Sequence, residues 1–191
     1  MDAISYRYPD TDNDVFRDFS ASFSIRQRTA ILAQSGRGKT TLLHLLAGLI
    51  KPISGNIYYP ADSEERPSFS MVFQEDRLLE YRTLLKNIKL TAGQTSDEHI
   101  DELLKIAGLY QYRDKKISAL SGGEKRRCAI LRALLANYDI LLLDEPFTGL
   151  DGETKTAMIN LVSDSVGDKT MILVTHDERD ADSLGCDILR L

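Results

Sequence analysis

The chain has 191 residues, enough for one domain with a sizeable core, or for one core with a smaller insertion. Charged residues make up 28% of it and the net charge is -5, which argues against direct binding to DNA or RNA. The apolar runs are far shorter than the roughly 20 residues that span a bilayer. We therefore expect a cytoplasmic protein that reaches a membrane only through a partner.

The first predicted unit is a strand followed by a loop and a helix. The short apolar run TAILA, residues 29–33, is typical of a strand. Leucines at helical spacing fill residues 38–47, and Gly48 should end this helix.

The loop between them follows the phosphate-binding pattern G-x-x-x-x-G-K-[ST] except at its first position. Gly38, Lys39 and Thr40 fill the end of the pattern, whereas Ala33 replaces the first glycine. Backbone N–H groups of residues 35–41 could hold phosphates, with Lys39 adding a positive charge and Thr40 binding Mg²⁺. A residue that leaves a strand at negative φ can be alanine, so we expect the loop to work. A glycine-rich turn in an arbitrary α/β protein is the alternative.

Four further segments predict strands. GNIYY (55–59) and FSMVFQ (69–74) are rich in β-branched and aromatic residues. DILLLDE (139–145) and TMILVTH (170–176) are continuous apolar runs, as expected of buried parallel strands. Strands that alternate with helices indicate an α/β fold with a mostly parallel sheet.

Residues 75–138 show helical patterns and nothing typical of a strand, so we expect a helical insertion. TSDE at 95–98 predicts a capping box at the start of one helix, which Gly108 should close. A second, largely buried helix should begin near Gly122. The buried face of the first helix is expected to consist of Ile100, Leu103, Leu104 and Ala107.

An acidic pair, Asp144 and Glu145, ends the apolar run ILLL. Open α/β sheets bind their ligands at the carboxyl ends of strands, where Asp144 could orient water on Mg²⁺ and Glu145 could polarise an attacking water. A solvated turn is the alternative for such a pair alone. A phosphate loop about 100 residues upstream counts against that alternative.

The octapeptide LSGGEKRR, residues 120–127, places Ser121 before two glycines and a predicted helix start. Alone, Ser121 could be merely a helix cap. Together with the phosphate loop and the acidic pair, this octapeptide resembles the signature of the ATP-binding cassette (ABC) family, the nucleotide-hydrolysing subunits of ABC transporters. The resemblance covers nearly the whole chain, with every element in family order.

The resemblance implies a P-loop NTPase core with a mostly parallel sheet, an antiparallel β portion near the N-terminus and a helical insertion. Residues 1–191 would form one ABC ATPase domain. Its catalytic core would comprise residues 1–75 and 137–191, and residues 76–136 would form a helical subdomain that carries the signature.

The same resemblance implies ATP and Mg²⁺ as cofactors and assigns their contacts. ATP would be held by Tyr8, Ser35, Gly36, Arg37, Gly38, Lys39, Thr40, Thr41, Ser121, Gly122, Gly123, Glu124 and Asp151. Mg²⁺ would be bound by Thr40, Gln74 and Asp144. Tyr8 matches the aromatic residue that stacks on adenine, although a tyrosine of the core or of an edge strand is the alternative, since Tyr6 lies nearby.

Three residues receive catalytic roles from the resemblance: Glu145, His176 and Gln74. Gln74 matches the glutamine that joins sheet and insertion, reaches Mg²⁺ and water, and senses the membrane partner. His176 in VTHD matches the histidine that contacts the γ-phosphate; a satisfied histidine at a strand end is the alternative.

In this family two cassettes pack head to tail, so we expect a homodimer. Ser121, Gly122 and Gly123 would then serve the nucleotide of the partner, and Asp151 in FTGLD would cross to the other subunit, although it could also cap a helix. Glu124 replaces a commoner glutamine, and we expect activity to survive this change.

We therefore expect the ATPase subunit of a membrane transporter, on the cytoplasmic face of the inner or plasma membrane through a separate permease. Residues 72–88 look like their counterpart in bacterial importers of small anions, such as sulfonate or nitrate systems. A soluble ABC-type ATPase of translation, DNA maintenance or cluster assembly is the alternative. Glu145 and His176 together oppose a third possibility, a binding module without catalysis.

Overall fold

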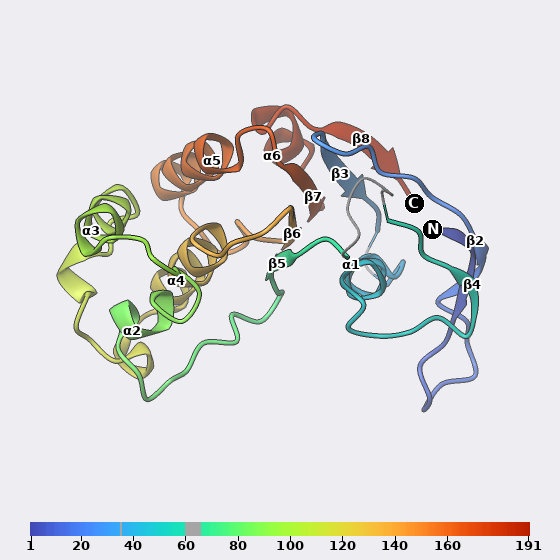
Figure 1. The fold of residues 1–191 in the computed structure, drawn as a ribbon, viewed down its shortest axis with the longest axis horizontal. Coiled ribbons are helices and arrows are strands. Elements are labelled where there is room, and N and C mark those ends of the chain that lie inside the picture. The colour runs from blue at the N-terminus through green and yellow to red at the C-terminus, as the bar shows by residue number, and fades with distance from the viewer. Residues whose placement is uncertain (35, 60–65) are drawn as a thin grey trace.

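A five-stranded parallel sheet in the order β5-β6-β7-β3-β8 forms the centre of the computed structural model, which describes residues 1–34, 36–59 and 66–191 (Figure 1). Every neighbouring pair of these strands is parallel, as the apolar runs predicted. The strands are β3 (Arg28–Leu32), β5 (Phe69–Val72), β6 (Ile140–Asp144), β7 (Thr170–Thr175) and β8 (Asp187–Arg190).

A smaller antiparallel sheet, in the order β2-β1-β4, lies beside α1 near the N-terminus, as expected. Its strands are β1 (Asp2–Tyr6), β2 (Phe16–Phe19) and β4 (Ser54–Asn56). The strand predicted at 55–59 was only partly right, because residues 57–59 lie outside β4. Tyr59 instead donates its hydroxyl hydrogen to the carbonyl of Leu46 (2.7 Å) and packs edge-on against Phe69, so this segment leaves the sheet to cover the end of α1.

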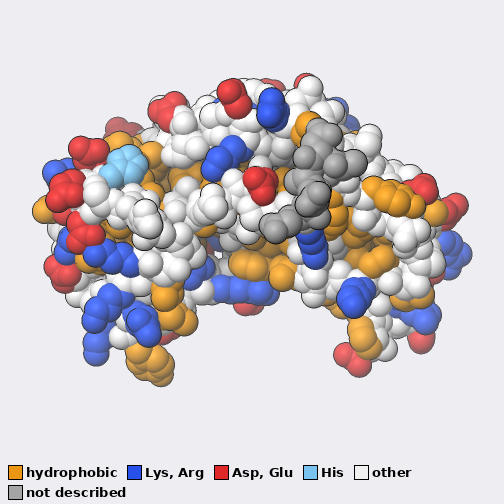
Figure 2. All heavy atoms as spheres, viewed as in Figure 1, with side chains coloured by type: hydrophobic (Ala, Val, Ile, Leu, Met, Phe, Trp, Pro, Cys, Tyr) orange, Lys and Arg blue, Asp and Glu red, His pale blue; other side chains and the backbone are white. Residues whose placement is uncertain are grey.

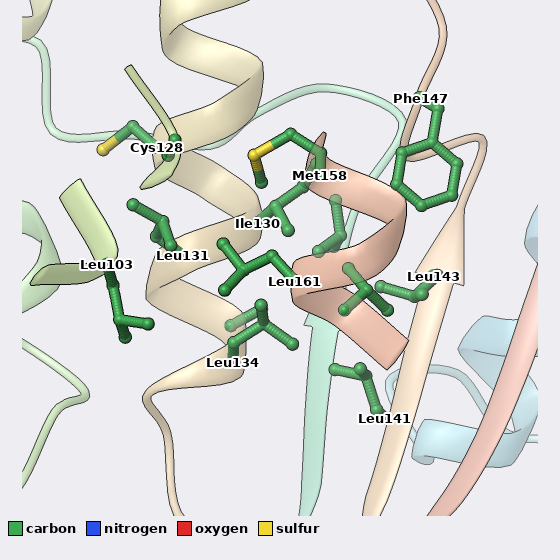
Figure 3. Packing of buried hydrophobic residues seen from close by; sticks show 14 of the residues in the cluster. Leu103, Cys128, Ile130, Leu131, Leu134, Leu141, Leu143, Phe147, Met158 and Leu161 are labelled. Atoms are coloured by element: carbon green, nitrogen blue, oxygen red, sulfur yellow. The ribbon is translucent and has the colours of Figure 1, made fainter. Parts of the chain in front are cut away.

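Helices cover both faces of the parallel sheet, and alternate strand residues pack on opposite faces. Leu141 and Leu143 of β6 belong to a core with α4 (Gly122–Leu134) and α5 (Gly152–Val166). Leu142, between them, belongs to a second core with α1 (Lys39–Ala47) and β1. Figure 3 shows the first core at Leu103, Cys128, Ile130, Leu131, Leu134, Leu141, Leu143, Phe147, Met158 and Leu161. The sheet is thus a rigid support whose edges can carry a site.

The chain between β5 and β6 is helical where the sequence predicted an insertion. It contains α2 (Leu84–Ile88), α3 (Asp97–Ile106), the 3-10 turns η1 (Tyr110–Tyr112) and η2 (Ile117–Ala119), and α4. The predicted face of α3 is buried, and Gly108 follows its end with φ +64°. The predicted capping box at 95–98 was wrong, because the N-cap is Ser96, one residue later, and its side chain accepts from the N–H of His99.

The last helix, α6 (Glu178–Ser183), follows β7 directly. Across the described ranges, the helices are too short or too polar for any of them to traverse a bilayer.

Candidate active site

The carboxyl ends of four neighbouring strands meet at one edge of the parallel sheet. The strands are in register, with Ile31 of β3 beside Val174 of β7 and Leu143 of β6 beside Leu173. The loops that leave this edge carry, in spatial order, Gln74 after β5, the acidic pair at the end of β6, His176 after β7 and the phosphate-type loop after β3. The fold therefore collects segments that lie far apart in the sequence where α/β sheets bind ligands.

A cavity of about 360 Å³ opens at this edge. It is lined by Tyr8, Val15, Gly36, Gly38, Lys39, Thr40, Thr41, Gln74, Asp144 and Glu145. All of these except Val15 are residues that the sequence singled out. Arg37 lies apart from this cavity, in an adjoining hollow that Tyr8 and Gly36 also line. Ser35 lies outside the described residues.

The loop geometry requires glycine at two positions, and Ala33 is not one of them. Gly36 and Gly38 both have φ +82°, in the left-handed region. A Cβ on Gly38 would lie 2.6 Å from Cγ1 of Val15 and 2.9 Å from Cζ of Phe16. Ala33 is absent from the described non-glycine residues with positive φ, as expected for a residue that leaves a strand. The alanine thus fits the loop without backbone strain.

Lys39, at the start of α1, folds its side chain back over this loop. Its ammonium donates to the carbonyls of Ala33 (2.8 Å) and Gln34 (3.3 Å). Gly38, the preceding residue, is the N-cap of α1, so N–H groups at the helix start face the same cavity as the lysine. A positive charge and free backbone donors together make an anion site.

Thr40 and Asp144, two of the predicted Mg²⁺ ligands, are in direct contact. The Thr40 hydroxyl donates to Oδ2 of Asp144 at 2.6 Å, although the two residues come from different segments. Asp144 is only 1% exposed. Burial raises the pKa of its carboxyl above the ordinary value, and the hydrogen bond from Thr40 acts in the opposite direction. The negative charge of Glu145 also raises this pKa, whereas His44 and Arg126 lower it without offsetting the effect of burial.

Glu145 and His176 form a second pair. Nδ1 of His176 and Oε2 of Glu145 lie 2.7 Å apart in a hydrogen bond, in which Nδ1 donates when it carries the ring proton. The Nε2 atom of the same ring is then left for another partner. Glu145 has φ +49°, an unusual value for a residue with a Cβ, and its N–H donates to the carbonyl of Val174. Glu145 thus lines the cavity, whereas His176 does not line it and lies in another hollow with Ala33, Gln34 and Arg37.

Tyr8 lies at the cavity, whereas its neighbour Tyr6 is the buried tyrosine. The Tyr8 hydroxyl is 2.9 Å from Oγ1 of Thr41, so one of the two hydroxyls donates to the other. Its ring meets that of Tyr6 edge-on, with ring centres 5.1 Å apart. Tyr8 is 38% exposed and Tyr6 only 7%. An exposed aromatic face beside a phosphate-type loop is suited to stacking on a planar ring.

The remaining predicted residues form a separate group that does not line the cavity. Ser121 caps α4 in a full capping box: its N–H donates to Oε2 of Glu124 (2.8 Å) and its hydroxyl accepts from the N–H of Glu124 (3.3 Å). Asp151 caps α5 by accepting from the N–H of Thr154 (3.0 Å). Gly123 adjoins the turn before Asp151, since a Cβ on it would lie 3.9 Å from the carbonyl of Gly149. Ser121, Gly122, Gly123, Glu124 and Asp151 therefore gather elsewhere on the chain.

Two residues at the site were missed from the sequence. Val15 lines the cavity and packs against Gly38, but a lone valine before a strand carries no signal. Arg126 is buried and bonds to the backbone of both the loop after β5 and the end of β6. Its only sequence signal is its place in the signature helix, within a run of basic residues that is more often a solvated face.

Three features meet at this cavity: a glycine loop at a helix start that suits an anion, the lysine that follows it, and a threonine of α1 bonded to the aspartate that ends β6. Together they define a P-loop nucleotide-binding protein. The model of the family described as "ABC transporter" matches residues 16–148. The chain belongs to this family: it is an ATP-binding subunit of the ABC type and an ATPase.

Curated relatives in this family are named for import. The chain is 38% identical to the aliphatic sulfonates import ATP-binding protein SsuB 1 of Rhodococcus jostii, over 93% of this chain and 72% of that protein. It is 35% identical to the taurine import ATP-binding protein TauB of Pseudomonas fluorescens, over 100% of this chain and 76% of that protein. It is 38% identical to the thiamine import ATP-binding protein ThiQ of Haemophilus influenzae, over 83% of this chain and 80% of that protein.

Solved structures give the same assignment. A dimeric post-hydrolysis state of the ATP-binding cassette MJ0796 bound to ADP and Pi superimposes with a TM-score of 0.83. The two sequences are 28% identical, and the match covers 100% of this chain and 92% of the other. The resemblance predicted a P-loop NTPase core with a mostly parallel sheet, an antiparallel β portion and a helical insertion in the chain between two strands. This fold is confirmed.

Proposed function

We propose that this chain is the ATP-hydrolysing subunit of a membrane importer for a small solute, acting as a head-to-tail homodimer. The observation that carries the proposal is the meeting of two pairs, Thr40 with Asp144 and Glu145 with His176, at one edge of the sheet beside Lys39. The relatives are named for the import of sulfonates, taurine or thiamine, and these names support the transport role.

ATP would enter the cavity with its phosphates at the start of α1. Backbone N–H groups of the loop, residues 35–41, would bind the phosphate oxygens, and the Lys39 ammonium would leave the carbonyls of Ala33 and Gln34 for the β- and γ-phosphates. Tyr8 would stack on adenine, and Arg37 would lie beside the nucleotide in the adjoining hollow.

Mg²⁺ fits the contact between Thr40 and Asp144. Hydroxyl and carboxylate oxygens are the ligands that this ion prefers, and Gln74 lines the same cavity with an amide oxygen. In the part of the chain that the structure describes, no three His, Cys, Asp or Glu side chains form a metal cluster. A phosphate-bound ion needs no such cluster, because phosphates and water complete its shell. When bound, Mg²⁺ would neutralise charge on the transferring phosphate.

Glu145 would act as the base for hydrolysis. It would accept a proton from a water whose oxygen attacks the γ-phosphorus, while the bond to the bridging oxygen breaks and ADP and phosphate leave. His176 would hold the Glu145 carboxylate through Nδ1–H, and its Nε2–H would donate to the γ-phosphate when the ring carries a proton on both nitrogens. Gln74, in the loop after β5, would orient the same water.

The second group of predicted residues supports the dimer. Ser121, Gly122, Gly123 and Glu124 lie at the start of α4, and none of them lines the chain's own cavity. Helix N-termini bind phosphate, so this start would serve the nucleotide of the partner, with Asp151 crossing beside it. Two solved structures of the cassette MJ0796, which this chain resembles, are described as dimeric.

A permease would bind each cassette and place it at the cytoplasmic face of the inner or plasma membrane. Figure 2 shows an arched molecule with a notch between its two arms, where hydrophobic and basic side chains meet. Exposed apolar residues Leu79 and Tyr81 lie in the segment after Gln74, which suits contact with a partner protein. We also infer the division into a catalytic core, residues 1–75 and 137–191, and a helical subdomain, residues 76–136.

The substitution Glu145→Gln tests the proposed chemistry. We expect ATP turnover to fall by about 100-fold or more, because an amide cannot accept the water proton, while ATP affinity changes little. Steady-state ATPase assays and a titration with a fluorescent ATP analogue measure the two quantities. Glu153→Gln, an exposed change on α5, is the matched control and should keep wild-type turnover. Turnover by Glu145→Gln at the wild-type rate would remove Glu145 from this role.

A further inference from the structure

Arg126 is a buried arginine whose guanidinium lies between the two loops that carry Gln74 and Glu145. It stands near the start of α4 and is only 6% exposed. Toward the loop after β5, Nη1 donates to the carbonyls of Phe73 and Gln74 and to Oδ1 of Asp76 (3.1 Å). One side chain of the signature helix thus holds the segment that presents Gln74.

The same guanidinium also holds the end of β6. Nη2 donates to the carbonyls of Asp144 and Glu145, each at 2.7 Å, and Nε donates to the carbonyl of Pro146 at 2.9 Å. Every N–H group of the fork therefore has an acceptor. Arginine presents five donors in one plane, whereas lysine presents three from one point, so lysine could not reach both loops at once.

The contact between Arg126 and the carbonyl of Glu145 acts on a residue whose backbone conformation is unusual. Glu145 has φ +49°, and such a backbone persists only where its surroundings fix it. Its N–H is fixed by Val174 and its carbonyl by Arg126. Loss of the guanidinium would free one side of this peptide and remove the donor from the buried carbonyls of Asp144 and Pro146 and from the partly buried carbonyl of Phe73.

We propose that Arg126 is a positioning residue for ATP hydrolysis, which sets the loop of Gln74 and the backbone of Glu145 relative to each other. Arg126 belongs to the helix that begins at Ser121, so it also joins these loops to the segment that would serve the partner's nucleotide. The inference rests on the proposed roles of Gln74 and Glu145. On this account ATP contacts neither the Arg126 side chain nor the backbone carbonyl oxygens that accept from it, so binding should survive the loss of the guanidinium.

The test compares Arg126→Lys and Arg126→Gln with Arg132→Lys. Arg132 lies on the same helix and donates to the carbonyls of Asp76 and Arg77, but among its contacts in the described structure none reaches β6. For both Arg126 variants we expect kcat to fall about 10- to 100-fold, with KM for ATP changed less than about threefold. Amide hydrogen exchange should rise at residues 73–77 and at 144–148. For Arg132→Lys, kcat should stay within about twofold, with faster exchange only near residues 76 and 77.

The outcomes separate this inference from the proposed function. If either Arg126 variant that folds, as judged by thermal unfolding, keeps wild-type kcat or wild-type exchange at 144–148, the inference is wrong. If neither variant folds, or if Arg132→Lys loses kcat equally, Arg126 is a general structural residue and the inference is again wrong. Wild-type chain that hydrolyses no ATP would contradict the proposed function, while the exchange data would still test the positioning of both loops.

Discussion

Asp144 lies at the buried end of β6, and its carboxylate accepts a hydrogen bond from Thr40. Burial raises the pKa of this carboxyl, which means that the ionised form is disfavoured in the fold. The charge therefore lowers the stability of the fold, but it is suited to the binding of a cation. Asp144 thus lowers the stability of the fold, and its proposed role is to bind Mg²⁺.

We predict that Asp144→Asn stabilises the chain and raises its Tm, by about 2–4 °C for each 1 kcal/mol gained in a chain of this size. The amide keeps an oxygen for Thr40 and removes the disfavoured charge. Because the folded-state pKa is raised, the wild type loses stability as pH rises from about 4 through that raised value. The advantage of the variant should therefore grow as pH rises above about 4 and vanish below that pH. Calorimetry across this range decides it, and an Asn variant that melts lower at neutral pH would contradict the argument.

Ala33 and Gly36 make a matched pair in the same loop. Ala33 lacks positive φ, so Ala33→Gly should lower stability by about 0.4–1 kcal/mol through unfolded-state entropy and move ATP affinity less than about threefold. Gly36 has φ +82° with open space at its Cβ, so Gly36→Ala should lose roughly 1–2 kcal/mol to backbone strain alone. Thermal unfolding with an ATP titration measures both. An Ala33→Gly chain that is more stable and binds much more tightly would show that the alanine weakens the loop.

At the scale of elements, the start of α4 shows why Glu124 can replace the commoner glutamine. Its carboxylate accepts from the N–H of Ser121 and closes a capping box. Burial alone would raise the pKa of Glu124, but the hydrogen bonds from Ser121 and Tyr112 outweigh it and the pKa is lowered. Glutamine has an oxygen at the same place, so the helix start can keep its shape with either residue.

We predict that Glu124→Ala lowers stability by roughly 0.3–1.5 kcal/mol, the value of one helix-capping interaction, and that Glu124→Gln lowers it less. A lowered folded-state pKa contributes stability that is present above the unfolded value and lost as pH falls through the folded one. The difference between wild type and Glu124→Gln should thus be full above the unfolded-state pKa of about 4.3, shrink as pH falls below it, and disappear only below the lowered folded-state pKa. Urea unfolding at several pH values measures it. A Gln variant that is as unstable as Ala at neutral pH would show that the oxygen at this position is not what caps α4.

Sequence reasoning worked for elements whose pattern is local. The apolar runs at β6 and β7 and the leucine periodicity of α1 follow directly from burial, and both were predicted. It failed where tertiary contacts decide, as at residues 57–59, which leave β4 because Tyr59 bonds to Leu46. At the site, motif residues were found to lie together, but Arg126 could not be found, because its burial depends on two loops brought together by the sheet.

At the scale of the whole molecule, one chain carries two groups of predicted residues that do not meet. The cavity at the sheet edge holds Lys39, Asp144 and Glu145, whereas Ser121 and Asp151 lie at the starts of α4 and α5. Two copies placed head to tail would bring each group against the other. ATP would then stabilise the dimer, and loss of the γ-phosphate would let the two cassettes separate. A permease bound to the cassettes would thus alternate between two conformations, one for the closed dimer and one for the open dimer.

The most direct test of this composite site is the mass of the protein in solution with ATP and Mg²⁺. It compares Glu145→Gln alone with Glu145→Gln combined with Ser121→Arg. Ser96→Arg, in the same Glu145→Gln background, is the matched control, because Ser96 also caps an exposed helix start but lies on α3. Light scattering after size exclusion gives the mass, and a fluorescent ATP analogue gives the affinity of each variant.

We predict that Glu145→Gln forms a dimer with ATP and not with ADP, and that the Ser96→Arg control does the same. The Ser121→Arg chain should remain a monomer while its ATP affinity stays within about threefold, since its own phosphate loop is intact. A Ser121→Arg chain that still dimerises with ATP would contradict the composite site. Equal loss of ATP binding and dimer formation would place Ser121 in its own subunit's site instead, which also contradicts it.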